Sequence, residues 1–381
     1  MPALRRRLCF RQLRHNVLVL VLTLLSVIYI YVYTVYQYRV PHGAAQQPSP
    51  PKKCINEFRY QQPEVTEDFP TVSKGKPKIP HILHQTYRDH LIPVQFADYV
   101  RSFVDNHPTW KYYFWTDESG RKLLAERHPH LLSTWDGYVE NIKRSDMLRY
   151  LVLYEFGGVY ADLDMESLRP LDRATMKYGC VIPVEPFEHS VLLFGMPYMI
   201  NNAIMMCRPK HPFFKQVLYG LQQPPNKTFI DSADSVMKTT GPIFLTGEFN
   251  KYMGIETMTT EKNKTHWSGN SPFFYRGELL ETDNNGVYVP NTRYFTDELD
   301  ITLKAMFESM CKDTYSDCNN EMKRNACFEL NEQGFLRKST RFRFIRHNWH
   351  HTWSRGNKGV FIKDEFVHLE TLAPNNIIYQ K

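Results

Sequence analysis

Two glycines and two aspartates lie close together in the stretch Tyr154-Glu155-Phe156-Gly157-Gly158-Val159-Tyr160-Ala161-Asp162-Leu163-Asp164. The two glycines favour a turn that ends a helix, and the residues after them predict a β-strand. Side chains alternate between the faces of a strand, so Asp162 and Asp164 should point the same way while Leu163 points into the sheet. Paired carboxylates are oxygen ligands for Mg²⁺ or Mn²⁺. The stretch therefore predicts a metal site that holds a nucleotide diphosphate; a solvated strand face or a helix N-terminus is the alternative.

Strands and helices alternate around this stretch. Residues 78–86 predict a buried first strand, residues 93–106 a helix, and the aromatic residues 110–117 a second strand. Apolar residues of the segment 140–155 fall at helical spacing. This order is typical of an α/β body with a mostly parallel central sheet.

Polar residues follow two of the predicted strands. His84, Gln85 and Thr86 lie at the carboxyl end of the first strand. Asp162 and Asp164 lie at the end of the strand after the glycines. Ligands bind beyond the carboxyl ends of the strands in open α/β sheets. We therefore expect a nucleotide pocket and a metal site on one rim of the sheet.

The amino-terminal region predicts a membrane anchor. Residues 17–36 carry no charge and would form about 30 Å of helix, which matches the hydrocarbon thickness of a bilayer. Five arginines and no acidic residue lie in residues 1–16, which predicts a cytoplasmic tail and a lumenal body. A cleaved signal peptide is the alternative, but its apolar run usually has only about 7–15 residues. The Pro-rich residues 37–78 would then be a stem, residues 79–355 the folded domain and residues 356–381 a C-terminal extension.

The net charge of +7 agrees with that topology. Eight of the 47 basic residues and none of the 40 acidic ones lie in residues 1–53, so the remainder has a net charge near −1. The basic balance therefore gives no reason to expect a nucleic-acid partner.

Cysteines and glycosylation acceptors also favour a lumenal body. Six of the seven cysteines follow the predicted anchor, and an even number in an oxidising compartment permits up to three disulfides. The close spacing of Cys311, Cys318 and Cys327 favours a disulfide loop over a metal knuckle, because no Cys-x-x-Cys pair is present. Asn-x-Thr acceptors begin at Asn226 and Asn263.

The residues before the aspartates resemble a known family. The blocks that carry the resemblance are, in order, Lys143-Arg144-Ser145-Asp146-Met147-Leu148-Arg149-Tyr150, Leu153-Tyr154, Gly157-Gly158-Val159-Tyr160 and Asp162-Leu163-Asp164. This combination is similar to the glycosyltransferases with a sugar-binding DXD region. That family includes fungal initiating α-1,6-mannosyltransferases, inositol-phosphoceramide mannosyltransferases, and animal α-1,4-galactosyl- and α-1,4-N-acetylglucosaminyltransferases. Supporting similarities are Ile79 to Thr86, Asn201-Asn202, His211-Pro212-Phe213, Thr240-Gly241-Pro242 and His347 to Trp353, where Thr352 replaces the usual Ser.

The resemblance implies a GT-A-like nucleotide-sugar-binding fold that holds Mn²⁺ or Mg²⁺. Asp164 would bind the metal, and Asp162 would contact the metal or the donor ribose. His347 or His351 would close the metal shell, and His350 is a further candidate. The alternative for each histidine is a structural role inside the fold.

The resemblance also implies a donor pocket. Asp146 and Arg149 share a helix face and would meet the sugar hydroxyls; a surface ion pair is the alternative. Asn202 and Trp353 would contact the donor, together with His84, Gln85 and Thr86 named above. No catalytic nucleophile or base can be assigned from the sequence.

The implied activity is retaining transfer of a hexose to a glycolipid or glycan acceptor. Mannose from GDP-mannose is favoured, and a UDP-galactose or UDP-N-acetylglucosamine α-1,4-transferase is the alternative. A third reading is a noncatalytic Golgi subunit that keeps the fold. In each case the chain is expected in the Golgi membrane as a single-pass type II protein, alone or in a homo- or hetero-oligomer.

Overall fold

The computed structural model describes residues 27–28, 65–223, 235–255, 283–312, 320–335, 340–350, 365–377 and 379. The chain divides into two units, residues 1–53 and residues 54–381. Of the first unit only Val27 and Ile28 are described, and both are helical and exposed. No helix within the described ranges is long and apolar enough to span a bilayer. Apart from these two residues, the predicted tail and anchor lie outside the described part of the chain.

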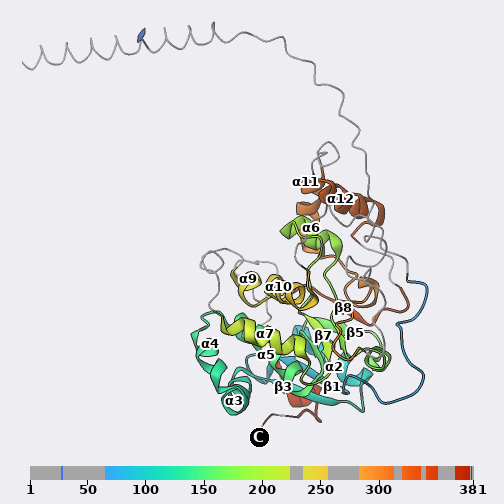
Figure 1. The fold of residues 1–381 in the computed structure, drawn as a ribbon. Coiled ribbons are helices and arrows are strands. Elements are labelled where there is room, and N and C mark those ends of the chain that lie inside the picture. Colours follow the sequence, from blue (N-terminus) through green and yellow to red (C-terminus); the bar gives the residue numbers. More distant parts are fainter. Residues whose placement is uncertain are drawn as a thin grey trace, which may run out of the picture. The chain divides into compact units, whose positions relative to one another are not determined.

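A five-stranded sheet with the strand order β3-β1-β4-β7-β6 forms the centre of the second unit (Figure 1). Its strands are β1 (Ile82–Thr86), β3 (Lys111–Trp115), β4 (Gly158–Ala161), β6 (Cys180–Val181) and β7 (Ile204–Cys207). Strand β1 pairs in parallel with β3 and β4, whereas β7 is antiparallel to β4 and β6. Strands β1, β3, β4 and β6 therefore run in one direction and β7 runs against them, so the sheet is mostly parallel, as predicted, with one antiparallel strand. The segment between β6 and β7 stays at one rim instead of crossing the sheet, so β7 returns in the opposite direction.

Helices surround this sheet, and two small sheets flank it. The predicted helices at 93–106 and 140–155 are confirmed as α2 (Ala97–Asn106) and α5 (Asn141–Phe156). The other α-helices are α3 (Asp117–Arg127), α4 (Leu132–Gly137), α6 (Phe187–Phe194), α7 (Pro212–Gln222), α9 (Ser235–Thr239), α10 (Pro242–Met253), α11 (Lys304–Cys311), α12 (Glu321–Gln333) and α13 (Leu369–Leu372). Short 3-10 turns are η1 (Val94–Phe96), η2 (Pro129–Leu131), η3 (Asp172–Thr175), η6 (Thr292–Tyr294) and η7 (Ile301–Leu303). The two-stranded sheets pair β2 (Leu91–Pro93) with β9 (Phe366–His368), and β5 (Met165–Ser167) with β8 (Ile345–His347).

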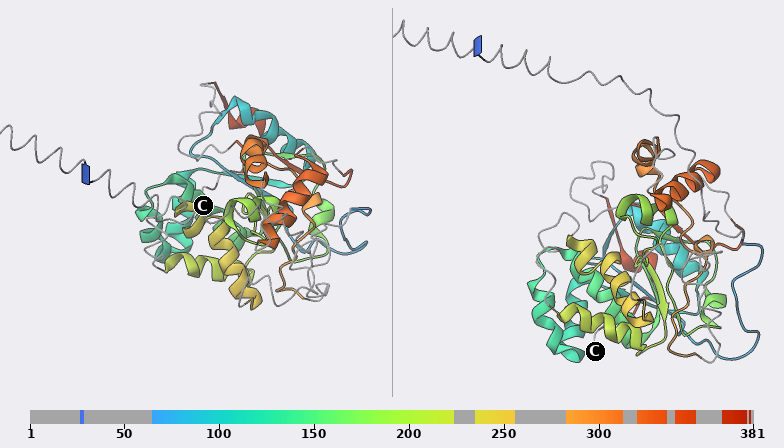
Figure 2. Two further views of the ribbon diagram at one scale, coloured as in Figure 1. Left: turned by 90° about the horizontal axis from the view of Figure 1, so that it is seen from above. Right: turned by 45° about the horizontal axis from the view of Figure 1, so that its top comes forward.

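Apolar side chains form a core on each face of the central sheet. Val159 and Ala161 belong to one buried cluster and Tyr160 to another, as the alternation of a strand requires. Helices α2 and α13 contribute to the first cluster, and α5 and α7 to the second. Figure 2 shows these two pairs of helices on opposite sides of the sheet. A third, smaller cluster joins α6, α11 and α12 (Figure 1).

The ends of the folded unit extend beyond the expected domain. Phe69, inside the predicted stem, is fully buried and packs edge-on against Tyr294 and Phe344. Tyr379, in the predicted C-terminal extension, packs against Trp115 of β3. The core therefore includes residues on both sides of the expected range 79–355.

Two disulfides are present in the described residues. Cys311 and Cys327 are bonded, within the predicted disulfide loop, and link the end of α11 to α12. Cys180 and Cys207 are bonded across β6 and β7. Cys318 lies outside the described residues.

The turn after α5 depends on two glycines. Gly157 has a φ of 63° and Gly158 a φ of 101°, a region that glycine adopts readily and other residues do not. A Cβ on Gly158 would also collide with the backbone carbonyl of Ile82 in β1. The pair thus allows the chain to leave α5 and enter β4 in close contact with β1.

A buried carboxylate, Glu155, ties the end of α5 to its neighbours. The Glu155 side chain is only 3% exposed and bonds the side chains of Lys210, His128 and Arg127. Burial raises the pKa of Glu155, but these hydrogen bonds outweigh it and lower the pKa to about 2. The ionised form is therefore strongly preferred in the folded protein.

We expect Glu155→Gln to destabilise the protein by about 3 kcal/mol at pH 7. A lowered pKa in the folded state stabilises the protein above the unfolded value of 4.5, and this contribution is lost as the pH falls toward about 2. Urea unfolding between pH 7 and pH 3 should show the wild-type protein losing stability below about pH 4.5, with a weaker loss in the variant. Glu118→Gln, at an exposed position of α3, is the control. Equal stability of Glu155→Gln and wild type at pH 7 would contradict this account.

Candidate functional site

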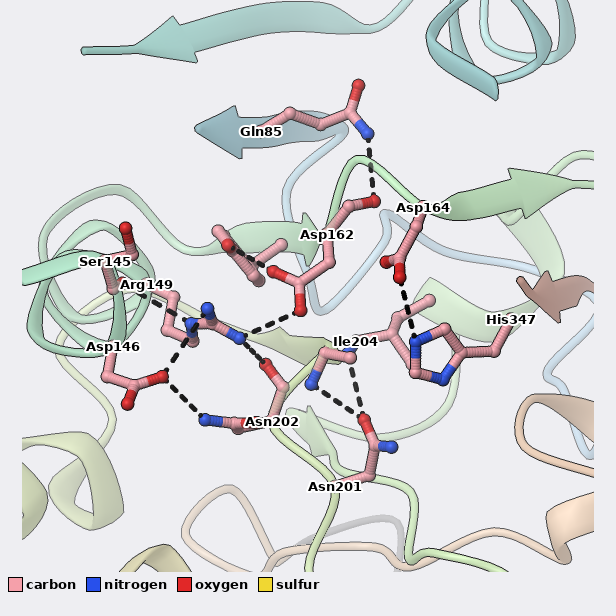
Figure 3. Close-up of polar contacts among 12 residues, drawn as sticks. Gln85, Ser145, Asp146, Arg149, Asp162, Asp164, Asn201, Asn202, Ile204 and His347 are labelled. Carbon is pink, nitrogen blue, oxygen red and sulfur yellow. Dashed lines mark hydrogen bonds and ion pairs between the residues drawn. The ribbon is translucent and has the colours of Figure 1, made fainter. Parts of the chain in front are cut away.

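The two aspartates lie in a turn at the carboxyl end of β4. Strand β4 ends at Ala161, and the backbone N–H of Met165 donates to the Asp162 carbonyl at 3.1 Å. The prediction that both aspartates lie on the strand was therefore wrong, because the strand ends two residues before Leu163, the last residue of its apolar pattern. Leu163 is buried, as expected. Figure 3 shows both carboxylates extending from the turn into the space between Arg149 and His347.

Both carboxylate oxygens of Asp162 have donors within the protein. Arg149 donates to Oδ2 at 3.1 Å, and the Tyr160 hydroxyl donates to Oδ1 at 2.6 Å. The backbone N–H of Asp162 donates to the Ala203 carbonyl at 2.8 Å, which fixes the turn against the start of β7. Asp162 is thus held firmly, with its remaining lone pairs available to a ligand.

Asp164 faces the segment that follows β8. Its Oδ2 accepts a hydrogen bond from the His350 backbone N–H at 3.0 Å and lies 3.5 Å from His347 Nε2. The antiparallel register pairs Met165 with His347 and brings these residues together. Burial raises the pKa of Asp164, but His347 and the His350 N–H outweigh it and lower the pKa to about 2. Asp164 is therefore a carboxylate at any physiological pH.

Of the predicted C-terminal histidines, the structure brings His347 to the aspartates. Its side chain is 11% exposed, and its ring lies 3.8 Å from the Trp349 ring, centroid to centroid. The His350 ring is directed to α2 instead, with Nε2 3.3 Å from the Tyr99 hydroxyl. His351 and Trp353 lie outside the described residues.

Asp146 and Arg149 are buried beside the turn, so the alternative of a surface ion pair does not apply. Their side chains are 3% and 4% exposed, and Arg149 Nη2 lies 3.5 Å from Asp146 Oδ1. Arg149 Nη1 bridges Asp162 and the Asn202 carbonyl, at 3.1 and 2.9 Å. The guanidinium therefore joins α5, the turn that holds the two aspartates and the segment before β7 (Figure 3).

A second group of polar contacts surrounds Asp146. Asn202 Nδ2 donates to Oδ1 at 3.0 Å, and the Thr240 hydroxyl donates to Oδ2 at 2.7 Å. Burial raises the pKa of Asp146 to about 6, against the lowering effect of Arg149 and these donors. In the sequence, Thr240 was noted only within Thr240-Gly241-Pro242, one of the segments that support the family resemblance. Its contact with Asp146 gives it a role in holding that carboxyl group. Tyr160, which was not proposed as a site residue, lies two residues before Asp162 and contacts it directly.

The predicted pocket residues of β1 have different surroundings. Gln85 reaches the turn, with Nε2 3.4 Å from the Asp162 carbonyl. His84 is fully buried, with Nε2 2.8 Å from the Gly157 carbonyl and Nδ1 accepting from Trp115 Nε1 at 3.1 Å. Thr86 donates to the Trp115 carbonyl at 3.0 Å. The structure thus brings Gln85 to the aspartates but uses His84 and Thr86 in contacts inside the sheet.

Asp164 and His347 suit a divalent cation. Adjacent ligand atoms around an octahedral ion at about 2.1 Å would lie about 3 Å apart, close to the 3.5 Å between Oδ2 and Nε2. His347 Nε2 is the ring nitrogen that faces Asp164, whereas Nδ1 is buried and has no hydrogen-bond partner among the described residues. One carboxylate and one imidazole leave further positions for phosphate and water, as Mg²⁺ sites commonly do.

A different set of ligand-type side chains lies at the opposite end of β7. Cys180, Cys207 and His211 are the described His, Cys, Asp or Glu residues whose ligand atoms gather in a group of three within 4.8 Å. Because Cys180 and Cys207 are joined in a disulfide, their sulfurs are not available as thiolates. This group therefore does not compete with the aspartate turn as a metal site.

Comparison with known proteins gives one family match, over part of this chain, and several similar proteins. Residues 93–180 match the family described as "Glycosyltransferase sugar-binding region containing DXD motif". Inositol phosphoceramide mannosyltransferase 1 of Schizosaccharomyces pombe is 31% identical over 208 residues, 53% of this chain and 61% of that protein. Mannosyl phosphorylinositol ceramide synthase SUR1 of Saccharomyces cerevisiae is 34% identical over 189 residues, 49% of this chain and 46% of that protein. The chain thus spans less than two thirds of the length of these relatives.

Among solved structures, one titled "PaToxG Glycosyltransferase" aligns with 46% of this chain and 70% of its own, at 17% identity. The TM-score of that alignment is 0.33, which is too low to establish a shared fold.

Proposed function

We propose that this chain, which carries the glycosyltransferase sugar-binding region with its DXD motif as the sequence predicted, transfers mannose from GDP-mannose to a glycolipid. The observation that carries the proposal is the meeting of two groups at one rim of the sheet. Asp164 and His347 lie 3.5 Å apart, where both could bind one cation, and Asp146, Arg149 and Asn202 form a buried polar network beside them. The relatives named as inositol phosphoceramide mannosyltransferases favour mannose as the sugar and a phosphoinositol sphingolipid as the acceptor.

The roles of the residues follow from their contacts. A divalent cation held by Asp164 and His347 would neutralise the charge that develops on the departing diphosphate. Asp162, fixed by Arg149 and Tyr160, would contact the ribose or the cation. Asp146 would accept hydrogen bonds from hydroxyls of the transferred sugar, and the Asn202 amide would donate to them. These groups bind and orient the donor, and no residue is assigned as nucleophile or base.

The proposal extends to the location of the protein. The uncharged residues 17–36 would anchor it in the Golgi membrane, with residues 1–16 in the cytoplasm and the transferase domain in the lumen. Such an anchor would keep the site near a lipid acceptor.

The test is a transfer assay with the full-length chain and Mn²⁺. We expect GDP-mannose to give mannosylated inositol phosphoceramide, detected by mass spectrometry, and UDP-galactose and UDP-N-acetylglucosamine to give no product. Transfer from a UDP-sugar instead would overturn the choice of mannose. If no donor gave either transfer or slow hydrolysis, the proposed transferase activity would be wrong and a noncatalytic subunit would be favoured.

A further inference from the structure

His347 presents only one of its two ring nitrogens to Asp164. Nε2 lies 3.5 Å from Asp164 Oδ2, whereas Nδ1 is buried with no hydrogen-bond partner among the residues that the structure describes. Buried polar atoms without partners are uncommon in folded proteins. A histidine that binds a metal through one nitrogen usually donates its other N–H to a carboxylate, a carbonyl or water. A group that receives this N–H would orient the ring toward the cation.

Glu185 is a carboxylate suited to that task. It lies in the segment after β6, at the same rim as the aspartate turn, and its side chain is 8% exposed. Its Oε2 also lacks a hydrogen-bond partner within the described ranges. An N–H donor and a carboxylate acceptor, both without a hydrogen-bond partner among the described residues, therefore adjoin the same two packed rings: His189 Nδ1 lies 3.6 Å from Glu185 Oε2, and the Trp349 ring lies 3.8 Å from the His347 ring.

A chain of hydrogen bonds connects Glu185 to the turn that holds the two aspartates. Its Oε1 accepts a hydrogen bond from Asn201 Nδ2 at 2.7 Å, and its backbone N–H donates to the Met199 carbonyl at 2.8 Å. Asn201 Oδ1 accepts from the Ala203 N–H at 2.8 Å, and the Ala203 carbonyl accepts from the Asp162 N–H at 2.8 Å. Figure 3 shows the Asn201 amide nitrogen on the side of the site where His347 lies.

The first turns of α6 enclose the other side of Glu185. His189 Nδ1 lies 3.6 Å from Glu185 Oε2, outside hydrogen-bond range. His189 Nε2 accepts from the Asp300 N–H at 3.0 Å, so a neutral His189 carries its proton on Nδ1. The His189 ring packs 4.7 Å from the Trp349 ring, which lies against His347. The region around Glu185 and His347 is thus closed by aromatic side chains, in which a hydrogen bond between charged groups is strengthened.

We propose that Glu185 is a positioning residue for His347: its Oε2 accepts a hydrogen bond from the Nδ1–H of His347, directly or through one water, when a cation binds at Nε2. This inference rests on the proposed function, because it takes Asp164 and His347 as the cation ligands. The carboxylate would fix the tautomer and orientation of the imidazole and increase the basicity of Nε2. Glu185 itself would contact neither the cation nor the sugar.

The test measures Mn²⁺ binding to the full-length chain without any donor, by calorimetry and by electron paramagnetic resonance of free Mn²⁺. Glu185→Gln should weaken Mn²⁺ binding by about 10–100-fold, the usual effect of losing such a partner. The matched control is Glu248→Gln, which removes another buried carboxylate, in α10, where Lys251 and Gln216 contact it. This control should bind Mn²⁺ as the wild type does.

Equal Mn²⁺ affinity of Glu185→Gln and wild type would overturn the inference and leave the proposed function intact. Failure of the wild type to bind Mn²⁺ would overturn the proposed metal site, and the inference with it. A second measurement needs no variant at Glu185, in case that variant does not fold. Nitrogen-15 imidazole NMR of the wild type with Mg²⁺ should show His347 protonated at Nδ1, with a strongly downfield proton. Protonation at Nε2 would overturn the inference.

Discussion

Replacing Asp164 by asparagine should reduce mannose transfer by about 10²–10³-fold and leave the protein folded. The carboxylate would supply the negative charge that holds the cation at the diphosphate, and an amide would not. Asparagine keeps an oxygen that can accept the hydrogen bond from the His350 N–H, now at 3.0 Å, so the local fold should persist. Steady-state transfer rates at saturating Mn²⁺, together with thermal unfolding, measure the two effects separately.

The matched control for Asp164 is Glu166→Gln. Glu166 lies two residues further along, in β5, where its side chain pairs with Arg346 at 2.9 Å, and it has no proposed role at the cation. Its loss should leave the transfer rate close to that of the wild type. Equal rates for Asp164→Asn and Glu166→Gln would remove Asp164 from the proposed metal site.

The second large effect is expected at Arg149 and concerns stability. Arg149→Met should lower the free energy of unfolding by about 3–5 kcal/mol, because it leaves one buried and one partly exposed carboxylate without their positive partner. The two carboxylates are Asp146, 3% exposed, and Asp162, which Arg149 contacts at 3.1 Å. Urea unfolding at pH 7 measures the change.

Two further variants make the Arg149 result specific. Arg121→Met removes an exposed arginine that pairs with Asp136 at 2.8 Å, and its urea midpoint should stay close to that of the wild type. Arg149→Lys should remain well below wild-type stability, because one ammonium cannot bond Asp162 and the Asn202 carbonyl, as Nη1 does, and also approach Asp146, as Nη2 does. If Arg149→Met unfolded at the same midpoint as Arg121→Met, the buried network would not stabilise the protein as we infer.

The local elements around the glycine pair could be predicted from the sequence. Apolar spacing located α2 and α5, and aromatic content located β3, because these signals depend on residues near one another in the chain. The direction of β7 could not be predicted in this way. It depends on a connection from β6 that contains α6 and returns at the same rim, and nothing in the local pattern fixes such a path.

In the candidate site, too, local relationships could be predicted from the sequence and long-range contacts could not. Asp146 and Arg149 lie three residues apart on one helix, so the sequence predicted that they share a face. Their burial could not be predicted, because it depends on contacts with Asn202 and Thr240. The contact of Asp164 with His347 joins strands about 180 residues apart and was expected only from the family resemblance. Glu185 was not predicted as a site residue, because the residues next to it in the sequence form no motif that the resemblance includes.

Metal-dependent donor binding is measured without an acceptor by the thermal stability of the full-length chain with GDP-mannose, with and without Mn²⁺. A ligand that binds only the folded state raises the melting temperature, so this measurement reports donor binding without requiring an acceptor. We expect GDP-mannose to raise the melting temperature with Mn²⁺, EDTA to abolish the rise, and Asp164→Asn to show none. The same rise in EDTA as in Mn²⁺, or an undiminished rise in Asp164→Asn, would contradict a metal-dependent donor site at the aspartate turn.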